Sequence, residues 1–422
     1  MVHQVSLKDY EDLVGSALID NINSLGENLQ GYKILHINST RSGGGVAEIL
    51  KSLVPLMAEA GLVAGWQVLT GNPEFFHTTK QFHNGIHGQP VHVSGEMLES
   101  YLAIAHQNQH LVTGDNDLVV IHDQQPLGLT AFRSKSNSRW LWYCHVDPRY
   151  AAPAVWYFLA PMVAVCDIAV FHLPEYARNL PVLQYFMPPA IDPLSDKNKD
   201  ISPDEYEAIL ARLGIDPEGP PVILQVSRFD RLKDPAGVIE VFKLVRQARP
   251  CRLLLAGGSA ADDPEGAVIL NEVQALAEGD PDITILALPP DANLEINVLQ
   301  RRADVVVQKS LREGFGLTAA EALWKGKPLV ATSAGGLAHQ VIDGKTGLTA
   351  RTVEETAGQV ERLLADPALG RRLGAAGREH VRQHYILPVY LYNWLKMINL
   401  LDGQRRAEMK AGSRRQGDAS RN

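Results

Sequence analysis

Short, continuous apolar runs alternate with longer amphipathic stretches along most of this chain. In the first half the runs are Lys33–Asn38, Trp66–Thr70, Leu118–Asp123, Trp140–His145 and Ile168–Leu173, and in the second half they are Val222–Ser227, Arg252–Gly257, Ile283–Leu288, Val305–Lys309 and Pro328–Thr332. Runs of Val, Ile and Leu without polar alternation are typical of parallel strands buried on both faces. Their alternation with helical stretches predicts an α/β fold in which helices connect parallel strands.

A proline-rich, charged segment at residues 187–221 separates the two series of runs. Such a segment is typical of a domain boundary. We therefore expect two Rossmann-like doubly wound domains, residues 1–195 and 196–385, with ligands outside the carboxyl ends of the strands. The aromatic-rich residues 386–402 indicate a final helix that packs on an apolar surface, and the polar residues 403–422 are expected to be a disordered tail.

Composition excludes several classes of protein. The chain has 422 residues and can bury more than one core. Its 40 basic and 48 acidic residues give a net charge of −8, which is no general footprint for nucleic acid. Three cysteines without a Cys-x-x-Cys pair favour a reducing compartment over a disulfide framework or a zinc site. Without a signal peptide or a membrane-spanning apolar stretch, we expect a cytoplasmic protein with no membrane partner. The oligomeric state stays open, a homodimer included.

The first candidate site is the loop that follows the first apolar run, where Gly43, Gly44 and Gly45 open a helix. Glycines let the backbone approach a ligand closely. A helix start also offers free N–H groups and a positive dipole end to a phosphate. The segment matches neither G-x-G-x-x-G nor a P-loop. It is therefore either an anion site or a tight turn whose glycines serve packing alone.

Two charged loops follow strands of the second half. Arg228 and Lys233 come directly after its first run, and both side chains suit phosphate oxygens; an exposed charged loop is the alternative. Glu313 and Glu321 lie eight residues apart in a glycine-rich loop and the helix after it. Loop amides near Gly316 could hold a phosphate while the carboxylates accept sugar or ribose hydroxyls, unless Glu321 only complements the helix dipole.

Histidines stand at the ends of two first-half strands, as His122-Asp123 and His145. They are either satisfied structural side chains or, at the mouth of a cleft, substrate ligands and proton carriers. The segment 115–117 resembles a metal clamp but precedes its strand, so we interpret it as a turn. The set His77, His83 and His87 lacks a carboxylate frame, and no metal site is predicted.

The combination of these motifs resembles the retaining GT-B glycosyltransferases of the glycogen synthase and sucrose synthase type over about residues 30–400. The shared features are the triple-glycine loop, the Arg-x4-Lys pair and the Glu-x7-Glu loop and helix, in that order. Several segments resemble the trehalose glycosyltransferring synthases more closely, among them NSTRSGGGVAEILKSLVP (38–55), HDQQP (122–126), CHVD (144–147) and REGFGL (312–317). Trehalose phosphorylases of similar architecture share many of these segments.

The resemblance implies a GT-B fold whose final helix crosses back onto the first domain, and a site of three parts. The implied catalytic residues are Arg228, Lys233, Glu313, His145 and Asp123. The implied donor site consists of Gly43, Gly44, Gly45, Arg228, Lys233, Glu313, Gly314, Phe315, Gly316, Leu317, Thr318 and Glu321. The implied acceptor site consists of Asn38, Glu48, Asp123, Gln124 and His145.

The implied reaction joins glucose from UDP-, ADP- or GDP-glucose to free glucose with retention of configuration, reversibly or not. No cofactor or metal is required, because Arg and Lys supply the counter-charge of the diphosphate. The alternatives are a trehalose phosphorylase that uses inorganic phosphate, a glucosyltransferase with another small acceptor, and a sugar-nucleotide epimerase. A non-catalytic nucleotide-sugar binding protein is a further alternative. An NAD-dependent dehydrogenase is disfavoured because the chain lacks a G-x-G-x-x-G turn.

Overall fold

The computed structural model describes residues 5–42, 44–135, 137–258 and 265–419. Two parallel six-stranded sheets form the centres of two α/β domains, which confirms the predicted fold class. The first sheet has the order β2-β1-β3-β4-β5-β6 and consists of β1 (Lys33–Asn38), β2 (Val63–Val68), β3 (Leu118–His122), β4 (Arg139–Cys144), β5 (Ile168–Phe171) and β6 (Leu183–Phe186). The second has the order β12-β11-β10-β7-β8-β9 and consists of β7 (Val222–Val226), β8 (Arg252–Gly257), β9 (Ile283–Ala287), β10 (Val305–Gln308), β11 (Leu329–Ala331) and β12 (Leu348–Thr349).

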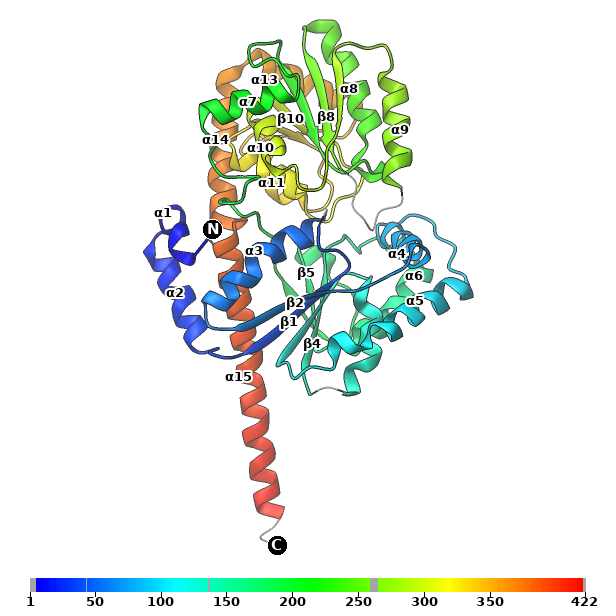
Figure 1. Ribbon diagram of the computed structural model, residues 1–422, viewed down its shortest axis with the longest axis vertical. Helices are drawn as coiled ribbons and strands as arrows, with labels where there is room; N and C mark the ends of the chain where they lie inside the picture. The colour runs from blue at the N-terminus through cyan, green and yellow to red at the C-terminus, as the bar shows by residue number, and fades with distance from the viewer. Residues whose placement is uncertain (1–4, 43, 136, 259–264, 420–422) are drawn as a thin grey trace.

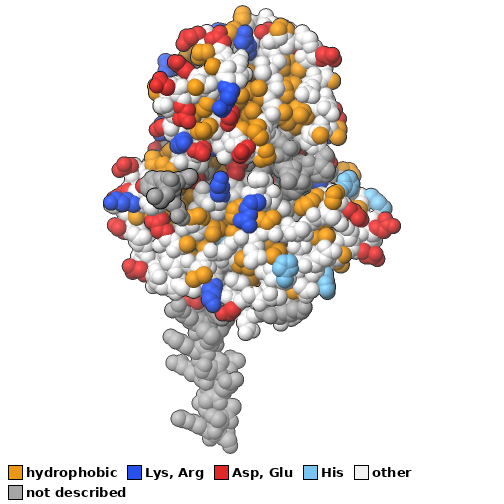
Figure 2. All heavy atoms as spheres, in the orientation of Figure 1, with side chains coloured by type: hydrophobic (Ala, Val, Ile, Leu, Met, Phe, Trp, Pro, Cys, Tyr) orange, Lys and Arg blue, Asp and Glu red, His pale blue; other side chains and the backbone are white. Residues whose placement is uncertain are grey.

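Helices cover both faces of each sheet (Figure 1). Those of the first domain are α1 (Glu11–Val14), α2 (Ser16–Glu27), α3 (Gly45–Glu59), α4 (Pro73–Ile86), α5 (Gly95–Gln107) and α6 (Pro153–Ala164). The second half carries α7 (Pro203–Arg212), α8 (Pro235–Ala248), α9 (Gly266–Ala277), α10 (Asn293–Arg302), α11 (Leu317–Trp324), α12 (Leu337–Gln340), α13 (Val353–Ala365), α14 (Pro367–His384) and α15 (Leu387–Ala419). In the space-filling view the two domains form an upper and a lower lobe (Figure 2).

Alternate residues of the central strands point into different cores. Leu118 and Val120 of β3 pack with α2, α3 and α15, whereas Val119 and Ile121 pack with α4, α5 and α6 on the opposite face. Burial on both faces explains why this strand reads as a continuous apolar run.

Asparagine and proline fix the start of α4, because the Asn72 side chain accepts a hydrogen bond from the Phe75 N–H and a proline follows it.

Three edge strands differ from the sequence prediction. β2 begins at Val63, three residues before the predicted run, and its side chains are mostly half-buried. β6 and β12 were not predicted at all, because β6 is largely exposed and β12 has only two residues. An edge strand has one neighbour and fewer buried side chains, so its sequence carries a weaker apolar signal.

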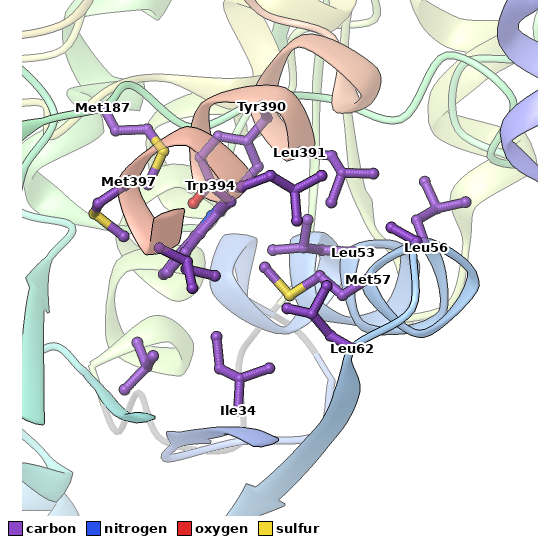
Figure 3. Close-up of a cluster of buried hydrophobic side chains, with 14 of the residues drawn as sticks. Ile34, Leu53, Leu56, Met57, Leu62, Met187, Tyr390, Leu391, Trp394 and Met397 are labelled. Atoms are coloured by element: carbon purple, nitrogen blue, oxygen red, sulfur yellow. The ribbon is translucent and has the colours of Figure 1, made fainter. Parts of the chain in front are cut away.

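α15 crosses back from the second domain and packs on the first (Figure 1). Its Tyr390, Leu391 and Trp394 are buried among Leu53 and Met57 of α3 (Figure 3). The sequence analysis ends this helix at residue 402 and expects a disordered tail, whereas in the structure the helix continues to Ala419. No proline interrupts residues 403–419, and several of them favour helices.

Candidate functional site

A cleft with a volume of about 330 Å³ lies between the carboxyl ends of the two sheets. This volume is at the lower end of the range for sites that bind small molecules. The predicted site residues that line it are Gly44, Gly45, Glu48, Asp123, His145, Arg228, Lys233, Glu313, Gly314, Phe315, Gly316, Leu317, Thr318 and Glu321. Gly43 lies outside the described residues. The structure therefore brings together motifs from both halves of the chain at one cleft.

Lys233 and Glu313 form the central ion pair of the cleft. The Lys233 Nζ lies 2.6 Å from Glu313 Oε2, and the Ser310 hydroxyl donates to the same oxygen at 3.2 Å. Lys233 ends a short turn after β7, while Glu313 precedes α11. Glu313 is only 7% exposed, so its charge depends on these partners. The loops after β7 and β10 thus place a cation and an anion side by side near the N-terminus of α11.

The N-terminus of α11 opens into this cleft. Gly316 precedes the helix with φ of +91°, a conformation that side chains rarely adopt. Leu317 and Thr318, the first two helical residues, line the cleft. Their backbone N–H groups have no partner within the helix ladder, and the helix dipole adds a partial positive charge. Together with Arg228 and Lys233 this end of α11 suits a phosphate group.

Asp230 is a site residue that the sequence analysis missed. Its Oδ2 lies 3.1 Å from the Lys80 Nζ and 3.6 Å from the Arg228 guanidinium. Burial opposes ionisation, but Lys80, Arg228 and Lys233 outweigh it and hold the pKa of the Asp230 carboxyl well below its usual range. Lys80 belongs to α4 of the first domain. Asp230 therefore orients Arg228 and also joins the two domains across the cleft.

A second ionic cluster also lines the cleft. Lys197, in the segment between the domains, places its Nζ 2.6 Å from Glu48 of α3 and 3.8 Å from Glu321 of α11. Burial raises the pKa of Glu321, and Lys197 opposes this rise. Glu48 thus lies beside Glu321, apart from the predicted acceptor residues Asn38 and Asp123.

A smaller cavity of about 140 Å³ adjoins the cleft, and the two share Gly44, Asp123, Arg228 and His83 in their walls. Asn38 also lines the smaller cavity, but its amide is engaged by the Thr40 carbonyl and the Trp66 indole. Its arrangement suits a role in shaping the loop.

Gln124, predicted to bind the acceptor, lines neither cavity. It is fully buried and donates from Nε2 to the Thr79 carbonyl, whereas the next residue, Gln125, lines the smaller cavity. The structure therefore does not place Gln124 at either cavity, and its assignment to the acceptor site has no geometric support. A shift of one residue along a turn reverses the direction of a side chain, and the sequence gives no signal for that choice.

Asp123 and His145 meet at the junction of the two cavities. Asp123 has a positive φ of 64°, and its Oδ1 accepts a hydrogen bond of 2.7 Å from the His145 backbone N–H. Both ring nitrogens of His145 are hydrogen-bonded within the protein, to His122 and His172. His145 therefore lines the cleft with its ring already fixed.

The sequence analysis also missed the cleft-facing side of α4. Lys80 and His83 line the smaller cavity, and His83 and His87 line the larger one. Their spacing of three and four residues places them on one helix face. Of the three, His83 and His87 were considered from the sequence as metal ligands alone, and Lys80 was not considered. Among the described residues, no group of His, Cys, Asp and Glu could hold a metal ion, and none of the described helices could cross a membrane.

Two family models match separate parts of this chain. Residues 36–178 match the family model "Trehalose synthase, N-terminal domain", and residues 211–380 match "Glycosyl transferases group 1". A trehalose synthase of Pyrococcus horikoshii is 40% identical to this chain, over 94% of this chain and 97% of the relative. A trehalose phosphorylase of Pleurotus pulmonarius is 27% identical over 89% of this chain but only 58% of its own length.

The fold has GT-B neighbours among solved structures. A UDP-forming α,α-trehalose-phosphate synthase from Burkholderia xenovorans, solved with glucose 6-phosphate, superimposes with a TM-score of 0.69. The superposition covers 87% of this chain and all of that one, at 14% identity, and so bears on the fold alone. The two matched domains and the extent of the 40% identity decide the family. The chain belongs to the trehalose synthase family of GT-B glycosyltransferases.

Proposed function

We propose that this protein transfers a glucosyl group from a nucleoside-diphosphate glucose to free glucose, with retention of configuration, and so forms trehalose. The observation that carries the proposal is the pair of adjoining cavities. The larger one has the cations and the helix N-terminus that suit a diphosphate, and the smaller one has the size and polar lining of a sugar site. Asp123 and Arg228 belong to both walls, which supports transfer of the glucosyl group at the junction of the two cavities.

The donor diphosphate would bind between Arg228, Lys233 and the N-terminal amides of α11. As the bond between C1 of the glucose and the phosphate oxygen breaks, negative charge grows on that oxygen. Fixed cations and amides stabilise this charge most in the transition state. Glu321 would accept the ribose hydroxyls, and Glu313 would accept hydroxyls of the donor sugar. The base would contact the backbone after β8 and β9, because Gly258 and Pro289 line the same cleft.

The new bond joins C1 to an oxygen of the acceptor glucose on the face that the phosphate leaves. The hydroxyl proton of the acceptor passes to the leaving phosphate, so that no protein nucleophile is used. Asp123 would orient acceptor or donor hydroxyls, and a dry cleft would protect the donor from hydrolysis. No metal or cofactor enters this scheme, because Arg228 and Lys233 supply the counter-charge.

The charges of the smaller cavity favour an acceptor without a phosphate group. Lys80, one of the cations in its wall, lies 3.1 Å from Asp230 and 3.7 Å from Glu265. Arg228 also lines the smaller cavity, but it belongs to the proposed diphosphate site as well. By contrast, the phosphate synthase of Burkholderia xenovorans was solved with glucose 6-phosphate. Free glucose therefore fits this cavity better than its phosphate ester.

Product analysis tests the proposal. The protein is mixed with UDP-, ADP- or GDP-glucose, and with glucose, glucose 6-phosphate or no acceptor. Trehalose and a free nucleoside diphosphate should appear only when a donor and free glucose are both present. Trehalose 6-phosphate as the only product would overturn the acceptor assignment. Release of glucose 1-phosphate from trehalose and inorganic phosphate, with no donor used, would instead establish a phosphorylase.

A further inference from the structure

We propose that His36, His122 and His172 are positioning residues, which together with His145 form one directional hydrogen-bonded chain that holds the Glu313–Gly314 loop against the first domain. The inference deepens the proposed function, because Glu313 belongs to the proposed donor site. It rests on three consecutive contacts between the four rings and on the contact of the last ring with a backbone carbonyl group.

The chain runs across four neighbouring strands of the first sheet. His36 Nδ1 lies 3.0 Å from His122 Nε2, and His122 Nδ1 lies 2.9 Å from His145 Nε2. His145 Nδ1 lies 3.1 Å from His172 Nε2, whose own Nδ1 lies 3.4 Å from the Gly314 carbonyl oxygen. The four histidines belong to β1, β3 and the residues directly after β4 and β5. These strands are neighbours in this order, and the histidines follow a diagonal toward their carboxyl ends, because His36 lies opposite Val120, two residues before His122.

The carbonyl of Gly314 fixes the direction of the chain. A neutral imidazole has one N–H donor and one acceptor nitrogen. Because a carbonyl oxygen can only accept, His172 must donate from Nδ1 and accept at Nε2. The same alternation then passes to His145, His122 and His36, so that every ring carries its proton on Nδ1.

The contact of His172 with the Gly314 carbonyl oxygen disfavours the opposite direction of the chain. That direction would turn the lone pair of His172 Nδ1 toward the lone pairs of a carbonyl oxygen, and both groups are buried. In the favoured direction the remaining unpaired group is His36 Nε2, a buried acceptor without a hydrogen-bond partner, next to the Trp394 ring. Burial keeps the chain neutral, because it lowers the pKa of His36 to about 3 and of His172 to about 4.

The loop at the end of the chain is a contact between the two domains. The Tyr176 hydroxyl donates to the Gly314 carbonyl at 2.9 Å, so two first-domain side chains hold that one oxygen. A side chain on Gly314 would meet the His145 carbonyl at 2.2 Å, which shows how closely the loop packs. The preceding residue, Glu313, pairs with Lys233. The histidine chain therefore bears on the position of a charged group in the donor site.

The first experiment uses the wild-type protein and needs no catalysis. The imidazole nitrogens of its 14 histidines are labelled with ¹⁵N, and two-dimensional ¹⁵N–¹H spectra at neutral pH report which nitrogen of each ring carries the proton. We expect four slowly exchanging rings, all protonated on Nδ1 and assigned by single substitutions. Mixed tautomers, or protonation on Nε2 in any of the four, would overturn the proposal.

The second experiment compares two substitutions at the far end of the chain. In His36→Asn the amide nitrogen replaces Nδ1 and can still donate to His122, whereas His36→Leu fills the space without a donor. His77→Leu, on the exposed side of α4, is the control. We expect His36→Leu to raise the KM for the nucleotide sugar about fivefold, the effect of roughly one lost hydrogen bond, and to mix the tautomers of the other rings. In His36→Asn, both the KM and the tautomers of the other rings should be close to those of the wild type.

Equal effects of the asparagine and leucine substitutions on KM and on the tautomers would contradict the proposal, since only packing would then matter. If a variant does not fold, the wild-type spectra still decide. The two proposals can fail separately. If the protein turns over no nucleotide sugar but the four rings are protonated on Nδ1, the proposed reaction is wrong and the chain of histidines stands.

Discussion

At the scale of single residues, the ion pair of Lys233 and Glu313 bears on two measurable quantities, the turnover of the enzyme and the free energy of unfolding. Replacement of Lys233 by alanine leaves the Glu313 carboxylate with the Ser310 hydroxyl as its one side-chain partner among the described residues. We expect turnover to fall by about 100-fold or more, since the proposed function gives Lys233 the role of stabilising the charge on the leaving group. The free energy of unfolding should also fall by about 1–3 kcal/mol, because a buried charge loses its partner.

Steady-state kinetics and urea unfolding of the same preparation check both effects. Lys199→Ala is the matched control, since Lys199 pairs with Asp196 at a more exposed position. The exposed pair should contribute less than about 1 kcal/mol. Turnover of the Lys233 variant close to the wild-type value would remove this lysine from the diphosphate site.

Gly314 permits a close approach that no other residue allows. A Cβ at this position would lie 2.2 Å from the His145 backbone oxygen, and backbone cannot shift as easily as a side chain. Gly314→Ala should therefore push the loop away from the first domain and reduce turnover by at least about tenfold. Glycine to alanine at Gly358, where a Cβ meets nothing within 4 Å, is the control. Equal activity of the two variants would show that the loop adapts without cost.

At the scale of elements, Lys197 links α3 of the first domain with α11 of the second through Glu48 and Glu321. Burial raises the pKa of Glu321, while Lys197 lowers it. Replacement of Lys197 by methionine should therefore raise this pKa further. In the proposed function Glu321 accepts two ribose hydroxyls, and a carboxylate accepts both better than a protonated carboxyl group does, so the acid limb of kcat/KM should move to higher pH.

The pH profiles of Lys197→Met and Lys197→Arg provide the measurement. Arginine keeps the positive charge, so its acid limb should stay near that of the wild type. A Lys197→Met profile that coincides with the wild-type profile would show that Glu321 does not need this lysine.

Residues 387–401 of α15 provide its described contacts with the first-domain core. Trp394 is completely buried there. Removal of residues 403–422 should leave the thermal midpoint unchanged, whereas Trp394→Ala should cost about 3–5 kcal/mol. Thermal unfolding followed by circular dichroism separates the two variants. A lower midpoint in the truncated chain would show that the end of α15 contributes to the fold.

At the scale of the whole molecule, buried histidines predict a loss of stability in acid. Among the described residues, burial holds the pKa of seven histidines below its usual value: His36, His83, His87, His122, His145, His172 and His384. In the unfolded chain these groups bind protons near pH ~6.5, while the folded chain keeps them neutral. The unfolded state therefore binds more protons below that pH, and stability falls as the pH falls.

Each such histidine contributes up to about 1.4 kcal/mol per pH unit between its two pKa values. The contribution of these histidines to stability should be constant above about pH 7.5 and should fall by several kcal/mol toward about pH 5. Urea unfolding at these two pH values measures the difference. The variant His77→Asn, at an exposed position, should leave this dependence unchanged. Equal stability at both pH values would contradict the prediction.

The sequence by itself determined the local parts of this protein. Continuous runs such as Leu118–His122 identify buried parallel strands. Both faces of such a strand pack on apolar groups, so successive residues are apolar whichever face they point to. The loops after those strands were identified as well, since glycines, Arg228, Lys233 and Glu313 carry their chemistry in their identity. The pattern weakened at β6 and β12, where edge strands bury too few side chains to leave an apolar run.

Only the tertiary structure decided which side chains meet. Asp230 and Lys80 lie 150 residues apart and meet only because the two domains face each other. Gln124 turns into the core while Gln125 faces the cavity, and the identities of these two neighbours are the same. Four histidines become one chain because the sheet order β1-β3-β4-β5 makes their strands neighbours. Strand order and domain packing arise from contacts distant in sequence, and local sequence patterns do not record them.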